Sequence, residues 1–224
     1  MQNNKRLRIA VDGPSGAGKS TVAKKVAQEL GVEYVDTGAM YRAIALKIAN
    51  SLDGAIDDED ALVEVLDNTE VGFLNGRIML DGEDVSGLIR TPEITDLASR
   101  SSALPIIREK LVDLQRKMGE NTDLIMDGRD IGSNVFPGAE VKFYITASPE
   151  VRAQRRFLEL KEKEPDTSFN EVLEAIIERD YNDSNRPLNP LVKTDDAVEI
   201  DTDSLGIDEV TDRMLEIVEK ASQK

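Results

Sequence analysis

The sequence of 224 residues contains no cysteine, no histidine and no tryptophan, and aromatic residues make up only 4% of it. Without cysteine the chain can form no disulfide bond, no thiolate nucleophile and no Cys-ligated zinc site. Without histidine it lacks the commonest general base and the commonest metal ligand. Any chemistry must therefore depend on Asp, Glu, Lys, Arg and the backbone, with a hard cation such as Mg²⁺ if a metal is used.

Positively charged residues are also scarce. There are 28 Lys and Arg against 44 Asp and Glu, which gives a formal net charge of −16. This balance argues against nucleic acid or an anionic membrane as the main partner, because either would require a basic face. No stretch approaches the roughly 20 apolar residues of a membrane span, and the apolar run near the N-terminus is too short for a signal peptide. We predict a cytoplasmic protein that binds neither nucleic acid nor membrane.

The hydrophobic pattern favours an α/β fold. Five short apolar runs have the character of buried strands, and amphipathic helical segments separate most of them, which predicts a parallel sheet. Helix starts are indicated at Thr91 and Ser148, each a capping hydroxyl before a proline, and at the acidic residues 57–59. The five runs are residues 7–11, 33–35, 124–126, 141–145 and 198–200.

One segment interrupts the α/β alternation. Residues 69–86 alternate apolar and polar side chains around Asn75-Gly76, a strong hairpin signal. We therefore expect an antiparallel insert outside the parallel core and place an insert domain at residues 37–104. The core domain then comprises residues 1–36 and 105–224, and its residues 161–169 are the expected mobile loop.

Residues 13–20, GPSGAGKS, fit a phosphate-binding loop between the first strand and a helix. Glycines in that place let backbone N–H groups surround an anion, and the helix N-terminus adds positive potential. Lys19 would reach the β and γ oxygens of a nucleotide, and the Ser20 hydroxyl could ligate Mg²⁺. A glycine-rich turn without a ligand is the alternative that this order of elements disfavours.

Asp127 ends the apolar run at 124–126, as an acid that helps to bind a nucleotide-associated metal would. Its alternative interpretation is a carboxylate that caps a turn at a strand end. Mg²⁺ would not depend on this residue, because phosphate oxygens, Ser20 and water can supply the ligands.

The bound phosphate could drive a motor, time a switch or be transferred to an acceptor. A GTP switch needs a guanine-reading motif, and the nearest candidate at residues 121–123 lacks its lysine and its spacing. The further signature segments of a motor ATPase are also not visible. A regulator that binds a nucleotide without catalysis is the rival from another class, and no feature of the sequence specifically supports it.

Arginines on four segments favour two bound phosphate groups over one. Taken singly, each has a plain alternative: a surface arginine on an amphipathic helix, a solvated turn, a solvated helix face, or an intrahelical pair with Asp183. The third segment places its arginines at i, i+3 and i+4, so it could close over a γ-phosphate as a lid at about residues 152–170. The segments carry Arg42; Arg129; Arg152, Arg155 and Arg156; and Arg179 with Arg186.

Six stretches in this order resemble the bacterial cytidylate kinases, a family of nucleoside monophosphate kinases, over nearly the whole chain. The phosphate-binding loop occurs in many families, whereas the later stretches are specific. The stretches are VDGPSGAGKS (11–20), DTGAMYR (36–42), DGEDVSGLIRT (81–91), DGRDIG (127–132), VFPGAEVKFY (135–144) and ERDYNDSNRPLNPL (178–191).

The resemblance implies a phosphate-loop core with a five-stranded parallel sheet, a β-containing insert that binds the monophosphate, and a lid. It also implies transfer of a phosphoryl group from ATP to CMP or dCMP with Mg²⁺. Separately, we expect a monomer. Some relatives have Gly where this chain has Ser20, so either Ser20 or Thr21 could supply the metal hydroxyl. Some have Ser at the position of Thr37. A kinase for another small acceptor, such as AMP, UMP or shikimate, is the nearest rival among enzymes.

Site residues follow from the matching positions. The residues expected to bind ATP are Gly13, Pro14, Ser15, Gly16, Ala17, Gly18, Lys19, Ser20, Thr21 and Arg152. Those expected to bind CMP are Thr37, Tyr41, Arg42, Ser99, Arg108, Arg129, Asp130, Arg179, Asp183 and Arg186. Those expected to assist transfer are Lys19, Arg129, Arg155, Arg156 and Arg179, and those expected to hold the metal are Ser20 and Asp127.

Overall fold

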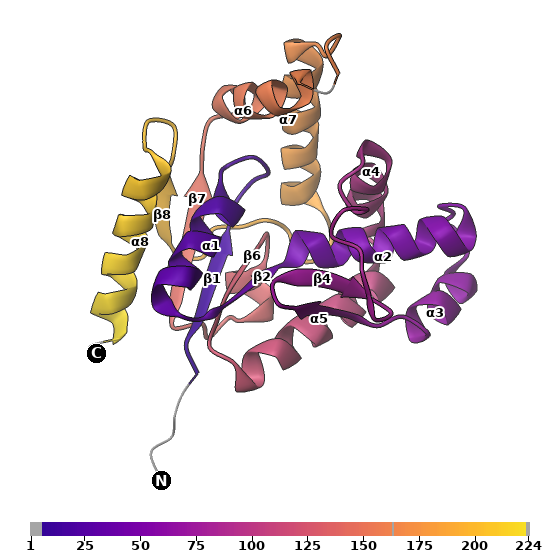
Figure 1. Ribbon diagram of the computed structural model, residues 1–224, viewed down its shortest axis with the longest axis horizontal. Helices are drawn as coiled ribbons and strands as arrows, with labels where there is room; N and C mark the ends of the chain where they lie inside the picture. The colour runs from indigo at the N-terminus through magenta and orange to yellow at the C-terminus, as the bar shows by residue number, and fades with distance from the viewer. Residues whose placement is uncertain (1–5, 163, 223–224) are drawn as a thin grey trace. The chain divides into compact units, whose positions relative to one another are not determined.

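The computed structural model describes residues 6–162 and 164–222. Its larger sheet has five strands in the order β2-β6-β1-β7-β8, with β1 at the centre (Figure 1). Each of the five predicted apolar runs forms one strand, so the predicted α/β fold is confirmed. The strands are β1 (Arg8–Asp12), β2 (Glu33–Asp36), β6 (Leu124–Gly128), β7 (Val141–Thr146) and β8 (Val198–Asp201).

The three inner strands β6, β1 and β7 are apolar because both of their faces are largely buried. Strand β1 pairs in parallel with β6 and β7, and β7 pairs in parallel with β8. Helices α1 (Lys19–Leu30) and α8 (Ile207–Ser222) lie side by side and share one core cluster with these strands (Figure 1). Fully buried members include Ile9, Phe143 and Ile200, each worth about 1.5–3 kcal/mol of transfer free energy.

Between β1 and α1 the chain makes the predicted glycine-rich loop. Gly13 has φ 144°, and a Cβ there would lie 1.9 Å from the carbonyl oxygen of Ile145 on β7. The loop therefore leaves β1 in contact with the neighbouring strand, and only glycine fits at its first position.

We expect Gly13→Ala to lower the free energy of unfolding by about 3 kcal/mol or more, because it combines an unfavourable φ with a backbone clash. Thermal denaturation followed by circular dichroism measures the effect. Gly138→Ala is the matched control, since no atom lies within 4 Å of its added Cβ. Equal melting temperatures for the two variants would contradict this account of the loop.

Three helices, α3, α4 and α6, begin where the sequence predicts them. The side chains of Asp58, Thr91 and Ser148 accept hydrogen bonds from N–H groups in the first turns of α3, α4 and α6. The elements are α2 (Thr37–Leu52), α3 (Glu59–Asp67), α4 (Pro92–Ser101), α5 (Pro105–Asn121), the short π-helix η1 (Ile131–Val135), α6 (Pro149–Lys161) and α7 (Phe169–Asn185). No helix in the described part of the chain has the length and apolar character needed to cross a membrane.

A separate antiparallel sheet occupies the predicted hairpin. Strands β3 (Val71–Leu74) and β4 (Arg77–Leu80) are joined by Asn75 and Gly76, both at positive φ, as a type I′ turn requires. A second turn at residues 81–82 adds the two-residue strand β5 (Glu83–Asp84), which the sequence analysis did not specify.

The chain divides into two compact units, residues 1–34 with 122–224 and residues 35–121. Helix α5 belongs to the second unit, whereas the predicted insert ends at residue 104. In the first unit α6 packs against α7, and the loop between them holds the segment predicted to be mobile, of which Lys163 lies outside the described residues.

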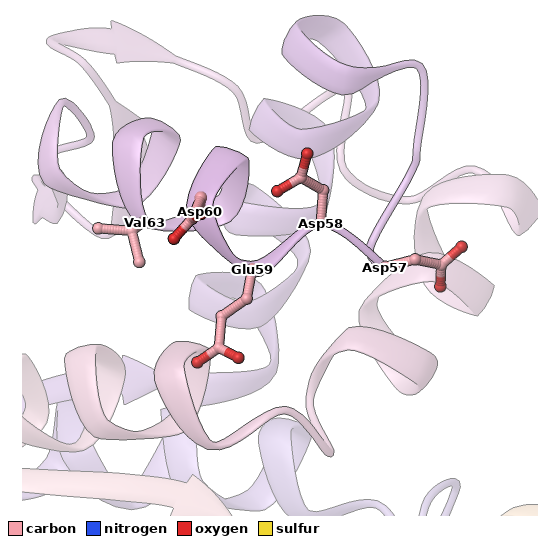
Figure 2. A pocket seen from close by; sticks show the side chains of 5 residues that line it. All are labelled: Asp57, Asp58, Glu59, Asp60 and Val63. Carbon is pink, nitrogen blue, oxygen red and sulfur yellow. The ribbon is translucent and has the colours of Figure 1, made fainter.

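An open acidic hollow lies at the start of α3 in the second unit, lined by Asp57, Asp58, Glu59, Asp60 and Val63. Figure 2 shows the carboxylates of Asp57, Asp58 and Glu59 pointing in different directions. Asp58 instead caps the helix by accepting from the N–H of Ala61. A hollow lined by four acids repels phosphate, so the residues that could bind a nucleotide lie elsewhere.

Candidate active site

The phosphate-binding loop occupies the carboxyl end of the central strand, where open α/β sheets bind their ligands. Lys19 is 5% exposed, and its ammonium donates to the carbonyl oxygen of Pro14 at 2.7 Å. Burial and, second to it, the guanidinium of Arg129 together lower the pKa of Lys19 to about 7. A bound phosphate would favour the charged ammonium, so the loop is suited to an anion.

Two predicted metal ligands meet at this loop. The hydroxyl of Ser20 donates to Oδ2 of Asp127 at 2.7 Å, and the hydroxyl of Tyr34 donates to Oδ1 of the same carboxylate at 2.7 Å. These are hard oxygen donors at the mouth of a phosphate-binding loop, which fits Mg²⁺. Thr21, the alternative hydroxyl, is exposed. No group of three or more acidic side chains gathers into a metal site within the described residues.

Asp12, the last residue of β1, was not among the predicted site residues. It is 5% exposed, and its two carboxylate oxygens accept from the backbone N–H groups of Ile131 and Gly132 at 2.8 and 2.7 Å. Burial raises the pKa of Asp12 from 3.8 to about 6, although these two hydrogen bonds oppose the shift. Its position immediately before Gly13 was the only available signal.

The raised pKa of Asp12 makes stability depend on pH. Between pH 3.8 and about 6 the folded state keeps a proton that the unfolded state releases, so the free energy of unfolding falls as pH rises. Over this whole range the free energy of unfolding falls by about 3 kcal/mol. Roughly half of that decrease occurs above about pH 5. Urea denaturation from about pH 5 to 7.5 should show this loss in the wild type and not in Asp12→Asn. Parallel stability curves would contradict it.

Two predicted arginine–aspartate sets meet in the first unit. Nε of Arg129, directly after β6, donates to Oδ2 of Asp183 on α7 at 2.8 Å. Nη2 of Arg186, at the end of α7, donates to Oδ1 of Asp130 at 3.1 Å, and both of these side chains are 8% exposed. The sequence suggested Asp183 as an intrahelical partner of Arg179, whereas its hydrogen-bonded partner is Arg129.

Arg179 is half-buried on α7 and interacts with the same set electrostatically. The charges of Arg129, Arg179 and Arg186 lower the pKa of Asp183 even though its burial acts in the opposite direction. The set therefore holds three guanidinium groups against the two carboxylates of Asp183 and Asp130, which leaves one positive charge in excess. Such an excess of positive charge is suited to a further anion.

The three arginines of α6 do not act as one group. Arg152 is 2% exposed; it donates to the carbonyl oxygens of Ala147 and Ser15 and binds both carboxylate oxygens of Asp180 on α7. Arg155 donates to the hydroxyl and carbonyl oxygens of Thr202. Arg156 forms an exposed pair with Glu159. Only Arg152 contacts the phosphate-binding loop directly.

A second set of predicted residues lies in the second unit. Asp36 caps α2 by accepting from Ala39 at 2.8 Å, and its other carboxylate oxygen lies 3.3 Å from Nη2 of Arg42. Arg108 is 1% exposed, with its guanidinium 5.7 Å from the ring centre of Tyr41. Thr37 is buried at the first position of α2, and Ser99 is half-buried on α4.

Fold and loop together define a phosphate-loop protein of the α/β class. A solved structure of shikimate kinase from Bacteroides thetaiotaomicron resembles the chain with a TM-score of 0.50 and 14% identity, covering 95% of this chain and 98% of that one. An uncharacterized protein from Eubacterium ventriosum gives a TM-score of 0.52 at 12% identity, covering 96% and 99%. At these identities the likeness concerns the fold alone.

Relatives found by sequence have a much higher sequence identity to this chain. The family model described as cytidylate kinase matches residues 9–220. The curated "Cytidylate kinase" of Lactobacillus johnsonii is 48% identical over 97% of this chain and 96% of its own length, and that of Clostridium perfringens is 44% identical over 97% and 100%. The chain belongs to the cytidylate kinase family, which confirms the resemblance found in the sequence.

Proposed function

We propose that the chain transfers the γ-phosphoryl group of ATP to CMP or dCMP, giving ADP and CDP or dCDP. The observation that carries the proposal is the buried Lys19 in the phosphate-binding loop, next to the Ser20–Asp127 hydrogen bond, in a member of this family. A panel of acceptors with ATP and Mg²⁺, assayed by ADP release, tests it. Comparable rates with AMP or shikimate would contradict it.

No side chain has to act as a nucleophile or strong base. The acceptor phosphate oxygen is anionic at neutral pH and can attack the γ-phosphorus in line. Catalysis then consists of positioning and of neutralising charge as it develops. Lys19 and the arginines can supply that charge, so a chain without histidine suits this chemistry.

Mg²⁺ would be held by Ser20 and Asp127, with phosphate oxygens and water as its other ligands. When bound, it neutralises charge on the transferred phosphoryl group. Tyr34 keeps one oxygen of Asp127 occupied and so fixes the orientation of that carboxylate. The hydrogen bond to Asp127 favours Ser20 over Thr21 as the hydroxyl ligand.

The α-phosphate of the acceptor would bind Arg42, Arg129 and Arg179. Arg129 and Arg42 are already oriented by Asp183 and Asp36, each within its own unit. A guanidinium held by one carboxylate still has N–H donors for a phosphate. The remaining acceptor contacts in the proposal are Thr37, Tyr41 and Arg186, with Asp183 also reaching the sugar.

Cytosine would be recognised by Asp130, Arg108 and Ser99. The base offers an N4 amino donor and the acceptors N3 and O2, so a carboxylate can accept from N4 while an arginine donates to the other side. Asp130 is ionisable, buried and oriented by Arg186 and Asn134. Uracil would place an acceptor against that carboxylate, which is unfavourable.

Asp130→Ala is expected to reduce the preference for CMP over UMP by at least about 10-fold, because it removes the group that rejects uracil. The ratio of kcat/KM for the two acceptors is the measurement. Asp113→Ala, on an exposed pair with Lys117, is the control and should keep the wild-type ratio. An unchanged ratio in Asp130→Ala would remove this residue from base recognition.

For residues at about 152–170, which include most of α6, we propose the role of a lid. Arg152 already joins it to the phosphate-binding loop, and Arg155 and Arg156 would assist transfer by contacting the phosphates. Residues 37–104 would act as the acceptor-binding insert. We further propose that the enzyme acts as a cytoplasmic monomer on free nucleotides; sedimentation at several concentrations tests the monomer.

A further inference from the structure

Asp12 joins two parts of the site that the proposed function treats separately. It ends the central strand, with Gly128 and Tyr144 as its neighbours on β6 and β7. The next residue, Gly13, begins the phosphate-binding loop. Both oxygens of its side chain accept hydrogen bonds from the segment after β6, while its charge also interacts with Lys19 of the loop.

The segment that Asp12 holds carries the proposed acceptor residues. Ile131 and Gly132, whose N–H groups it binds at 2.8 and 2.7 Å, directly follow Asp130. They also begin η1, where the N–H of Val135 donates to the carbonyl oxygen of Asp130 in the i→i+5 pattern. A single π-helical turn is rare and has poorer hydrogen-bond geometry than an α-helix, so it needs support from its surroundings.

The turn at η1 is also in contact with a second side chain, that of Lys142. A Cβ added to Gly132 would lie 3.3 Å from Oδ2 of Asp12 and 3.1 Å from Cδ of Lys142. Lys142 is 7% exposed and its ammonium is 2.8 Å from the carboxylate of Asp196, so its stem has little freedom to move. The backbone at Gly132 is therefore held between a carboxylate and a fixed lysine stem.

We propose that Asp12 is a positioning residue for the acceptor: its carboxylate fixes the turn after β6 so that Arg129 and Asp130 meet CMP in the productive geometry. The inference rests on the proposed roles of these two residues. Donor binding should change less, because the hydrogen bond that orients Lys19 goes to the carbonyl oxygen of Pro14, whereas Asp12 acts on Lys19 through its charge. A displacement of about 1 Å in such a positioning group can cost 100-fold in rate.

The test is Asp12→Asn, which keeps the shape of the side chain but can accept only one of the two hydrogen bonds. We expect KM for CMP to rise at least about 10-fold while KM for ATP changes less than about twofold. Asp123→Asn is the matched control: Asp123 also accepts a backbone N–H, that of Leu7 at 3.0 Å, before β6 and β1 begin, and both KM values should stay unchanged. Equal rises for both substrates, a rise for ATP alone, or no change would overturn the proposal.

A second variant keeps the test decisive if Asp12→Asn does not fold. Gly132→Ala retains the carboxylate but presses on it and on Lys142, so it should raise KM for CMP and spare KM for ATP, whereas Gly138→Ala should alter neither. An equal effect on both substrates, or none, would overturn the proposal. Asp130→Ala tests base recognition separately: if only that variant fails to behave as expected, the positioning effect acts through Arg129 and the cytosine assignment is wrong.

Discussion

Lys19→Ala is expected to lower kcat by about 1,000-fold or more, because it removes the buried ammonium of the phosphate-binding loop, which we propose neutralises charge on the transferred phosphoryl group. The fold should survive. Burial lowers the pKa of Lys19 to about 7, which means that the folded state gains nothing from charging this group. Steady-state turnover at saturating ATP and CMP, together with a thermal melt, measures both effects.

The control for this variant is Lys25→Ala on the same helix, whose ammonium is exposed and pairs with Asp208. Its turnover should stay within about twofold of the wild type, since an exposed pair contributes little. Near-normal turnover in Lys19→Ala would refute the role assigned to the lysine. A loss in both variants would point to a general effect of positive charge on α1.

Arg129→Ala is expected to raise KM for CMP by about 100-fold and to leave the affinity for ATP within severalfold of the wild type. The guanidinium would lose its charge-assisted contacts with the acceptor phosphate, which are stronger than neutral hydrogen bonds. The change also removes the 2.8 Å partner of Asp183, so the melting temperature should fall. Separate titrations with CMP and with an unreactive ATP analogue distinguish the two ligands.

Two variants separate charge from geometry at this position. Arg129→Lys keeps a cation near Asp183 but loses the planar fork, and we expect an intermediate KM for CMP. Arg77→Ala, on the exposed hairpin pair with Asp84, should change neither ligand. If Arg129→Ala lost more affinity for ATP than for CMP, relative to the wild type, the assignment of this arginine to the acceptor would be wrong.

Local chemistry accounts for most of the fold that could be predicted from the sequence. Runs such as residues 7–11 and 141–145 are short, apolar and followed by loop or helix signals, and each forms a strand. The Asn75-Gly76 turn is equally local, because its positive φ angles depend on two residue types. Strand β5 was not specified because two residues carry no periodic signal.

The site was only partly predictable, since its hydrogen bonds join residues far apart in the chain. The motif located Lys19 and Ser20, but nothing in the sequence pairs Tyr34 with Asp127 or Asp12 with Gly132. These contacts exist because β1, β2 and β6 end at the same edge of the sheet. Only the order of the strands brings them together.

The spacing of residues on a helix also does not predict which partners long side chains will bind. Arg152, Arg155 and Arg156 begin on adjoining positions of α6, yet their guanidinium groups reach the phosphate-binding loop, Thr202 and Glu159. Each arginine side chain is long enough to reach a different partner near its own end. The spacing defined where these arginines start and not what they bind.

The contacts of Arg152 limit how this enzyme can be rebuilt. One cation ties together the carbonyl of Ser15, the carbonyl of Ala147 and the carboxylate of Asp180. A protein engineer who exchanged α7 for that of another kinase would leave this charge without its counter-ion beside the ATP loop, at a cost of several kcal/mol. A graft of either helix would therefore have to transplant Arg152 and Asp180 as one pair.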